Sequence, residues 1–392
     1  MLNKIPAHNA LTYFSLAFIA MAGLAYINFL PGVVNALAGG IGFSDAEAGQ
    51  IVALNGYGGL VGSTLAIFLV HRVSWKLAMV VLLTGLTSMD IASAWVESYS
   101  VMLGWRFLAG AIGGLSLGIA FSVLARLDNP DRAFGTLLFV QFSIGSLVIY
   151  LLPGLERLVD AYAVFYVMAS FALSSVVLLL LLPEIDLGRE VAKRSVTLSA
   201  ECRNAFLLLM AIMLYQIAAS AIWAYVGLIG LGAGIAAESV NSYIAITGLL
   251  GLLGAMLPVV NGSRYGRLNW LVAGVALSIT AALLLNFAQQ QFLYVGAMAL
   301  LFFSWPAVQS YLLAVTAEMD GSGRLATVAA VVSFVGLATG PLLASSLLDN
   351  GSFSLMLYSC AAAFLLSYLL LVKPVQAHER SAAGVLSAKY QP

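Results

Sequence analysis

The sequence carries very little charge for its length. Only 9% of its 392 residues are charged, and 17 acidic side chains balance 17 basic ones. A soluble domain carries roughly 25% charged residues, and a nucleic-acid-binding protein needs a basic face, so both classes are excluded. Hydrophobic residues make up 62% of the chain, which excludes a disordered protein. The composition predicts a polytopic membrane protein.

Cysteine and histidine are also scarce. Cys202 lies in a polar loop and Cys360 in an apolar run, so we expect no disulfide between them. His8, His71 and His378 all lie in polar segments, which disfavours a zinc site or a Ser-His enzyme inside the apolar runs. A Gly-rich Walker loop for ATP is absent as well. We expect no enzyme activity, no cofactor and no metal site.

Apolar runs of membrane-spanning length occupy most of the chain. Crossing the hydrocarbon core takes about 20 residues in a helix, and none of the runs alternates with the period of two that β-barrel strands show. The first run is too long for the core of a signal peptide, so we interpret it as a retained span. The sequence predicts an all-α protein with twelve transmembrane helices, at 11–33, 46–70, 77–96, 99–125, 133–154, 161–183, 204–230, 238–260, 268–288, 291–317, 325–348 and 353–373.

One polar connection is much longer than the others and divides the spans into six and six. We therefore predict an N-terminal bundle at 1–183, a cytoplasmic linker at 184–203, a C-terminal bundle at 204–373 and a polar, mobile cytoplasmic tail at 374–392. With both termini placed in the cytoplasm, 15 of the 17 Lys and Arg residues fall on the inner side, and the outer loops hold only Arg157. This bias follows the positive-inside rule. We expect an integral protein of a bacterial inner membrane.

The two halves repeat each other at a single offset. A shift of 192 residues places Gly59 on Gly251, Arg72 on Arg264 and, in a second loop, Asp128 on Asp320 and Arg132 on Arg324. The offset spans six helices, an even number, so both halves have the same topology. Parallel halves related by a pseudo-twofold axis along the membrane normal are typical of transporters, whose substrate site lies near the midplane.

At these residues the chain resembles the major facilitator superfamily. Its loop signature is a Gly, a spacer and then Asp-Arg/Lys-x-Gly-Arg/Lys. The second half carries Gly254 followed by Ser263-Arg264-Tyr265-Gly266-Arg267, and the first half carries a weaker copy with Gly62 and His71-Arg72. Both copies lack the family's Asp. Arg106 followed by glycine resembles the family's second motif, whereas the Gly-Pro motif that many proton-driven drug antiporters have in span 5 is absent.

The resemblance also implies roles for charges at the cytoplasmic helix ends. In the family such charges form ion pairs that close the inner side of the transporter, so we expect Arg72 near Asp128 and Arg264 near Asp320 in one conformation. Ordinary solvated charge is the other interpretation. The gate residues predicted in this way are Arg72, Asp128, Arg264, Gly266, Arg267 and Asp320.

Arg106 and Asp90 are ionisable residues inside apolar spans. Arg106 lies about 10 Å deep at 1.5 Å per residue, and a charge at that depth usually faces a partner or a watery cavity. We interpret Arg106 as binding a substrate anion or coupling protons; the alternative is a structural arginine that snorkels to the interface. Asp90 lies at a similar depth on the preceding span, so it forms either a buried pair with Arg106 or a proton-titrating carboxylate.

Further polar and small residues interrupt the apolar spans. Gly110, Gly114, Gly118 and Ser122 form a stripe with Arg106 that predicts close helix packing, as do Gly58 and Gly62. Buried amides and aromatic side chains mark positions for substrate contacts, or alternatively for interhelical bonds and interfacial belts. The residues are Asn28, Asn55, Gln141, Gln216, Gln309, Trp223, Tyr225, Tyr243 and Trp305, and the resemblance favours Asn28, Gln141, Gln216 and Gln309 because their spans line the family's cavity.

The sequence therefore predicts a secondary active transporter that moves a small organic solute, anionic or polar, by alternating access. We expect a monomer in the lipid bilayer, driven by an ion gradient with protons as the candidate ion and without a nucleic-acid partner. A drug or metabolite efflux antiporter is the alternative within the same class. A ligand sensor with a transporter fold that does not transport is the alternative from another class, and a channel is weaker because two repeats do not suggest a ring of pore loops.

Overall fold

The structure is a computed structural model that describes residues 9–70, 72–124, 126–128, 130–182, 202–261, 266–319, 324–348 and 352–389. Within these ranges, twelve helices are long and apolar enough to cross a membrane. Each corresponds to one of the twelve predicted runs, so the expected all-α fold is confirmed.

The first half begins with α1 (Ala10–Asn28), which the short helix α2 (Leu30–Asn35) and the π-helical segment η1 (Ala36–Ile41) extend. Phe29 separates α1 from α2 because Pro31 has no backbone N–H to continue the helix. A capping box between Ser44 and Glu47 starts the next long helix. The remaining elements are α3 (Asp45–Leu69), α4 (Trp75–Ala92), η2 (Ser93–Trp95), α5 (Tyr99–Leu124), α6 (Pro130–Leu158) and α7 (Ala163–Leu181).

The second half follows the same order, with one break inside a predicted span. The run predicted at 238–260 forms two helices, which separate at Leu249 immediately after a glycine. Gly266 has a φ of +76°, a conformation that glycine tolerates, where the chain enters α11. The elements are α8 (Cys202–Gly232), α9 (Ala237–Gly248), α10 (Leu250–Asn261), α11 (Arg267–Leu284), η3 (Leu285–Phe287), α12 (Gln291–Met319), α13 (Arg324–Ser346) and α14 (Ser354–Lys389).

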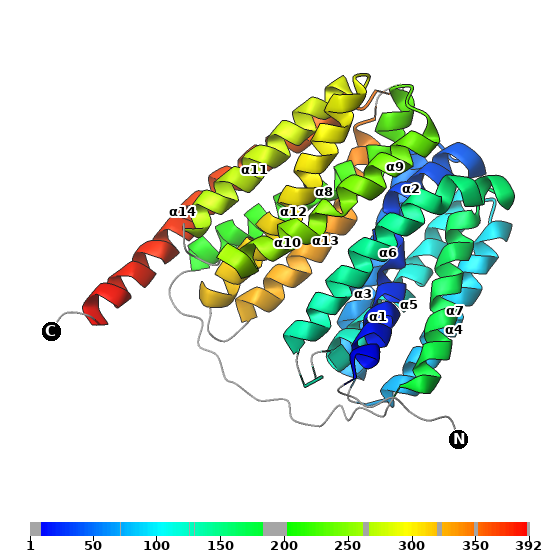
Figure 1. The fold of residues 1–392 in the computed structure, drawn as a ribbon, viewed down its shortest axis with the longest axis horizontal. Coiled ribbons are helices and arrows are strands. Elements are labelled where there is room, and N and C mark those ends of the chain that lie inside the picture. The colour runs from blue at the N-terminus through cyan, green and yellow to red at the C-terminus, as the bar shows by residue number, and fades with distance from the viewer. Residues whose placement is uncertain are drawn as a thin grey trace. The chain divides into compact units, whose positions relative to one another are not determined.

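The last helix differs from the sequence prediction. We expected a polar, mobile tail after residue 373, but α14 continues to Lys389 (Figure 1). Pro374 lies inside the helix without ending it, and Val375 is fully buried one residue later. The segment after Pro374 contains several alanines, which are strong helix formers.

The chain divides into two compact units. The first comprises Met1–Val191 together with Trp223–Ile246 and Pro341–Ser346, and the second comprises Ala192–Ile222, Thr247–Gly340 and Leu347–Pro392. In the first unit α1 packs against α5, α6 and α7, while α5 also packs against α3 and α4. In the second unit α12 packs against α10 and α11, and α14 packs against α11. The domain boundaries expected from the sequence stay predictions.

Glycines on α3 and α5 allow the closest helix contact of the first unit. A Cβ atom added at Gly62 would lie 1.9 Å from the carbonyl oxygen of Ala111, and one added at Gly114 would lie 2.0 Å from that of Gly59. The Asn55 amide Nδ2 donates a hydrogen bond of 2.9 Å to the carbonyl oxygen of Arg106 across this contact. The small-residue stripe therefore packs two backbones together, as the sequence indicated.

Candidate functional site

A buried charged cluster lies where α4, η2 and α5 meet. Arg106 Nη1 lies 3.0 Å from Asp90 Oδ1, and the two side chains are 0% and 4% exposed. Arg106 Nη2 donates to Ser93 Oγ at 2.6 Å and reaches the Met89 carbonyl oxygen at 3.5 Å. The guanidinium group is thus held by a carboxylate, a hydroxyl and a helix-end carbonyl, which compensate its loss of water.

Aromatic rings close the cluster on its other sides. The Arg106 Cζ atom lies 4.9 Å from the ring centroid of Phe165 and 5.7 Å from that of Tyr26, within cation–π distance. Arg106 Nε and the Tyr26 hydroxyl have no hydrogen-bond partner among the residues that the structure describes. The cluster is therefore the buried pair that we gave as one alternative, and Arg106 does not snorkel to an interface. A part for Arg106 and Asp90 in substrate binding or proton coupling stays a prediction.

The other predicted positions of the first unit carry uncharged polar groups. Asn28, at the end of α1, is 7% exposed, and its amide Nδ2 has no hydrogen-bond partner within the described ranges. Gln141 is half-buried on α6. Trp223 Nε1 donates to the carbonyl oxygen of Ile27 at 3.0 Å, and the Tyr225 hydroxyl donates to that of Asp45 at 2.8 Å. The Trp223 indole therefore donates to a carbonyl oxygen at the end of α1, one residue before Asn28.

The second unit brings together three of its predicted polar residues. Trp305 Nε1 donates to Gln216 Oε1 at 2.6 Å, and one turn further along α12 Gln309 Nε2 donates to Ser333 Oγ at 2.8 Å. Gln309 Oε1 has no hydrogen-bond partner in the part of the chain that the structure describes. Trp305 and Gln309 are half-buried, whereas Gln216 is 3% exposed.

The sequence did not single out a hydroxyl chain in the same unit. The Tyr215 hydroxyl lies 2.8 Å from Ser278 Oγ, which lies 2.9 Å from Ser304 Oγ, and all three residues are buried. Single serines occur in many apolar spans, so nothing in their spacing marks these residues. The contacts link α8, α11 and α12.

The predicted gate residues have different outcomes. Arg72 and Asp128 are both exposed, and they form no ion pair with each other in the described part of the chain. Arg264 and Asp320 lie outside the described residues. Both pairs stay predictions, each expected in at least one conformation.

Arg267 forms an ion pair that we did not predict. Its two terminal nitrogens bind both carboxylate oxygens of Glu318. Glu318 lies on α12, and in the sequence it comes two residues before the predicted gate residue Asp320. His378 Nε2 lies 3.2 Å from Glu318 Oε2, and Glu379 Oε1 accepts a hydrogen bond of 3.1 Å from the Leu268 backbone N–H at the start of α11. The extended α14 thus binds the helix end that follows the loop signature. The sequence signal available for this ion pair was an acidic residue, Glu318, at the end of α12.

The Arg267–Glu318 pair makes a pH-dependent contribution to stability. Glu318 lies beyond the apolar part of α12, which ends at Thr316. The adjacent Arg267 guanidinium, and then His378, lower the Glu318 pKa from 4.5 to about 2. The folded state thus binds this proton less readily than the unfolded state, so the contribution of the ion pair to stability is complete above about pH 4.5 and decreases as the pH falls toward 2.

We expect the melting temperature of Glu318→Gln to fall less than that of the parent between pH 5 and pH 3. Equal losses in detergent melting curves would contradict this.

Comparison with known proteins rests on structure alone. No protein-family model and no curated protein matches the sequence. The nucleoside transporter NupG superposes with a TM-score of 0.71 at 14% identity over 92% of this chain and 98% of that chain. A variant of NupG gives a TM-score of 0.74 at 15% identity over 94% and 98% of the two chains.

Two further transporters have the same fold. A bacterial homologue of the human lysosomal transporter Spinster, inward-facing and unoccupied, matches with a TM-score of 0.67 at 12% identity over 97% of this chain and 98% of that chain. The human organic anion transporter MFSD10 matches with a TM-score of 0.62 at 17% identity over 94% and 100%. The chain therefore has the fold of these transporters.

Proposed function

We propose that the protein is a secondary transporter that moves a small polar organic solute across a membrane by alternating access. The observation that supports this most is the fold, which follows that of three transporters over more than nine-tenths of the chain. A fold alone does not define a function, so the polar groups within the spans provide the second part of the argument.

We further propose that the solute is neutral and carries both hydrogen-bond donors and acceptors. Considered separately, the first unit offers an amide N–H group at Asn28 and the second unit offers an amide oxygen at Gln309, and neither group has a hydrogen-bond partner among the described residues. A buried polar group without a partner costs about 1–3 kcal/mol, which a solute hydroxyl or amide would compensate. Arg106, our sequence candidate for binding an anion, already binds Asp90 and Ser93, which disfavours an anionic solute.

A nucleoside has the required chemistry, with hydroxyl donors, carbonyl acceptors and a ring that stacks on an aromatic side chain such as Trp305. NupG is described as a nucleoside transporter and MFSD10 as an organic anion transporter, so these classes are suitable test substrates. We also propose that protons drive transport and that the protein is a monomer. The loop charges support cytoplasmic termini and a bacterial inner membrane.

Uptake into proteoliposomes tests the proposal directly. We expect labelled uridine to enter faster than labelled benzoate and a pH gradient to change the uridine rate. Gln309→Leu removes the free amide oxygen and should lower kcat/KM for uridine about tenfold, which corresponds to 1.4 kcal/mol. Gln289→Leu, the same change at an exposed glutamine, serves as the control. Absence of uptake for both solutes, or equal effects of the two variants, would contradict the proposal.

A further inference from the structure

The last part of α8 belongs to the same compact unit as the first half of the chain. Residues Trp223–Ile246 and Pro341–Ser346 are part of the first unit, and they form the end of α8, most of α9 and the end of α13. The loop charges assign the end of α8, the start of α9 and the end of α13 to the outer side of the membrane. Helices from both halves of the sequence are therefore joined at their outer ends.

Tyr225 forms a closely packed contact between α8, α3 and α13. Its side chain is fully buried, and its hydroxyl donates a hydrogen bond of 2.8 Å to the Asp45 carbonyl oxygen in the first turn of α3. A Cβ atom added at Gly49 would lie 1.9 Å from the Tyr225 hydroxyl oxygen. On α13, Ser345 Cβ and the Pro341 carbonyl oxygen would lie 2.9 Å and 3.0 Å from the same added atom. The glycine therefore allows α3 to approach both helices.

Two neighbouring positions of α8 contact α1 and α2. Trp223 Nε1 donates a hydrogen bond of 3.0 Å to the Ile27 carbonyl oxygen. One turn later, a Cβ atom added at Gly227 would lie 2.4 Å from Asn35 Nδ2, so this glycine leaves room for the amide. Together with Tyr225, these residues hold the outer end of α8 against three elements of the first half of the chain.

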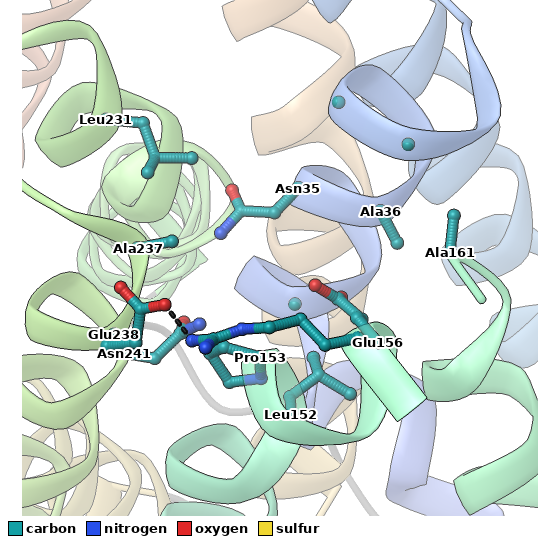
Figure 2. A pocket seen from close by; sticks show the side chains of 14 residues that line it. Asn35, Ala36, Leu152, Pro153, Glu156, Ala161, Leu231, Ala237, Glu238 and Asn241 are labelled. Atoms are coloured by element: carbon teal, nitrogen blue, oxygen red, sulfur yellow. Dashed lines mark hydrogen bonds and ion pairs between the residues drawn. The ribbon is translucent and has the colours of Figure 1, made fainter. Parts of the chain in front are cut away.

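An exposed ion pair joins two further helices of this unit less firmly. Arg157 on α6 and Glu238 on α9 form an ion pair with side chains that are 65% and 56% exposed. A cavity of about 400 Å³ lies beside the pair, and residues of α2, α6 and α9 line it (Figure 2). Surface ion pairs contribute little because water screens both charges, and a cavity supplies no packing contacts. The pair therefore stabilises the unit less than the buried contact of Tyr225.

We propose that the hydrogen bond of Tyr225 controls how often the outer side of the protein opens. The inference rests on the proposed transport function, because alternating access requires the outer ends of α3, α8 and α13 to separate in each cycle. Separation breaks the bond to the Asp45 carbonyl oxygen, so the hydroxyl stabilises the closed outer side. Gly49 allows the hydroxyl to reach that oxygen. Tyr225 is thus a positioning residue that acts on the conformation of the protein and not on the solute.

A buried thiol provides a measure of opening. Ser345→Cys places a thiol at a residue that is 5% exposed and lies next to Gly49, so N-ethylmaleimide reaches it when α3 and α13 separate. The natural Cys360, which is 5% exposed on α14 of the second unit, reports general unfolding in the same sample, and Cys202 is replaced by Ser. Mass spectrometry of the full chain in detergent measures both alkylation rates. Each rate follows the population of the open form when opening and closing are faster than alkylation.

Removal of one hydroxyl tests the hydrogen bond. In Tyr225→Phe we expect the thiol at position 345 to react about tenfold faster, which corresponds to 1.4 kcal/mol and to the loss of one buried hydrogen bond. Cys360 should react at the parent rate. Tyr215→Phe is the matched control, because it removes a buried hydroxyl with a contact of 2.8 Å to Ser278 in the second unit, and it should leave the rate at position 345 unchanged. Equal rates in these two variants, or a parallel rise at Cys360 in Tyr225→Phe, would overturn the proposal.

Three further variants separate the hydrogen bond from the ion pair. Gly49→Ala places a methyl group against the Tyr225 hydroxyl and should raise the rate at position 345 at least as much as Tyr225→Phe. Gly59→Ala makes the same change on the same helix at an ordinary contact distance, 3.7 Å from the Gly110 carbonyl oxygen, and should not raise the rate. Glu238→Gln should raise it less than about twofold. A larger effect of Glu238→Gln than of Tyr225→Phe would assign control to the ion pair and overturn the proposal.

Uridine uptake by the parent protein distinguishes a failure of this inference from a failure of the proposed function. If the parent transports neither uridine nor benzoate but Tyr225→Phe raises the thiol rate tenfold, the hydrogen bond controls opening and the proposed function is wrong. If the parent transports uridine and the thiol rate does not respond to Tyr225→Phe, the proposed function stands and the role of Tyr225 is overturned.

Discussion

Asp90→Asn is expected to destabilise the folded protein by about 3–5 kcal/mol. The change removes the charge that faces Arg106 Nη1 at 3.0 Å and leaves a guanidinium group that is 0% exposed. Ser93 Oγ and the Met89 carbonyl oxygen would remain, but neither carries a formal charge. An uncompensated buried cation costs far more than a surface ion pair contributes.

The double variant Asp90→Asn with Arg106→Gln should recover most of this loss. Both charges then disappear, and two amides occupy the space between Ser93, Phe165 and Tyr26. Asp128→Asn, the same change at an exposed aspartate, is the matched control and should change the free energy of unfolding by less than about 0.5 kcal/mol. Thermal melting in detergent measures all three variants. A double variant that is no more stable than Asp90→Asn would contradict a pair held together by charge.

The same double variant separates a structural from a transport role. If the pair only holds α4 and α5 together, the recovered protein transports uridine at the parent rate. If Arg106 or Asp90 also couples protons, uptake no longer responds to a pH gradient although the protein remains folded. Because stability and coupling are measured on one protein, a loss of folding cannot be mistaken for a loss of coupling.

The sequence predicted the features that depend on local composition and on neighbouring spans. The apolar runs predicted the twelve helices because lipid permits only helices or closed barrels. Asp90 and Arg106 lie at similar depths on consecutive antiparallel spans, which sufficed to predict that they could pair. The glycines of α3 and α5 indicated close packing in the same way.

Other features depend on contacts between distant parts of the chain, which a single sequence does not reveal. Glu318 binds Arg267 from a helix 51 residues away, and Glu379 binds the start of α11 across 111 residues. The rotation of each helix decides which amide faces which neighbour, and the spans have little amphipathic character to predict that rotation. The π-helical segment η1 was likewise indicated by no residue pattern in the sequence.

Gly114→Val is expected to prevent α3 and α5 from packing and to destabilise the first unit by about 3 kcal/mol or more. Overpacking usually costs 1–3 kcal/mol, and here the group that a new Cβ would meet is the Gly59 carbonyl oxygen at 2.0 Å. Backbone atoms inside a helix cannot rotate away as a side chain can. Separating the helices would also break the hydrogen bond from Asn55 Nδ2 to the Arg106 carbonyl oxygen, so the loss should extend to the charged cluster.

Gly104→Val is the matched control on the same helix. A Cβ added at Gly104 meets no atom within 4 Å, and the residue is exposed, so the same change of residue type should alter the free energy of unfolding by less than about 0.5 kcal/mol. Melting curves and size-exclusion profiles in detergent compare the two variants. Because both introduce the same β-branched side chain into α5, helix propensity cancels between them. Equal melting temperatures would show that the contact between the two backbones does not determine stability, and a loss confined to Gly114→Val would show that it does.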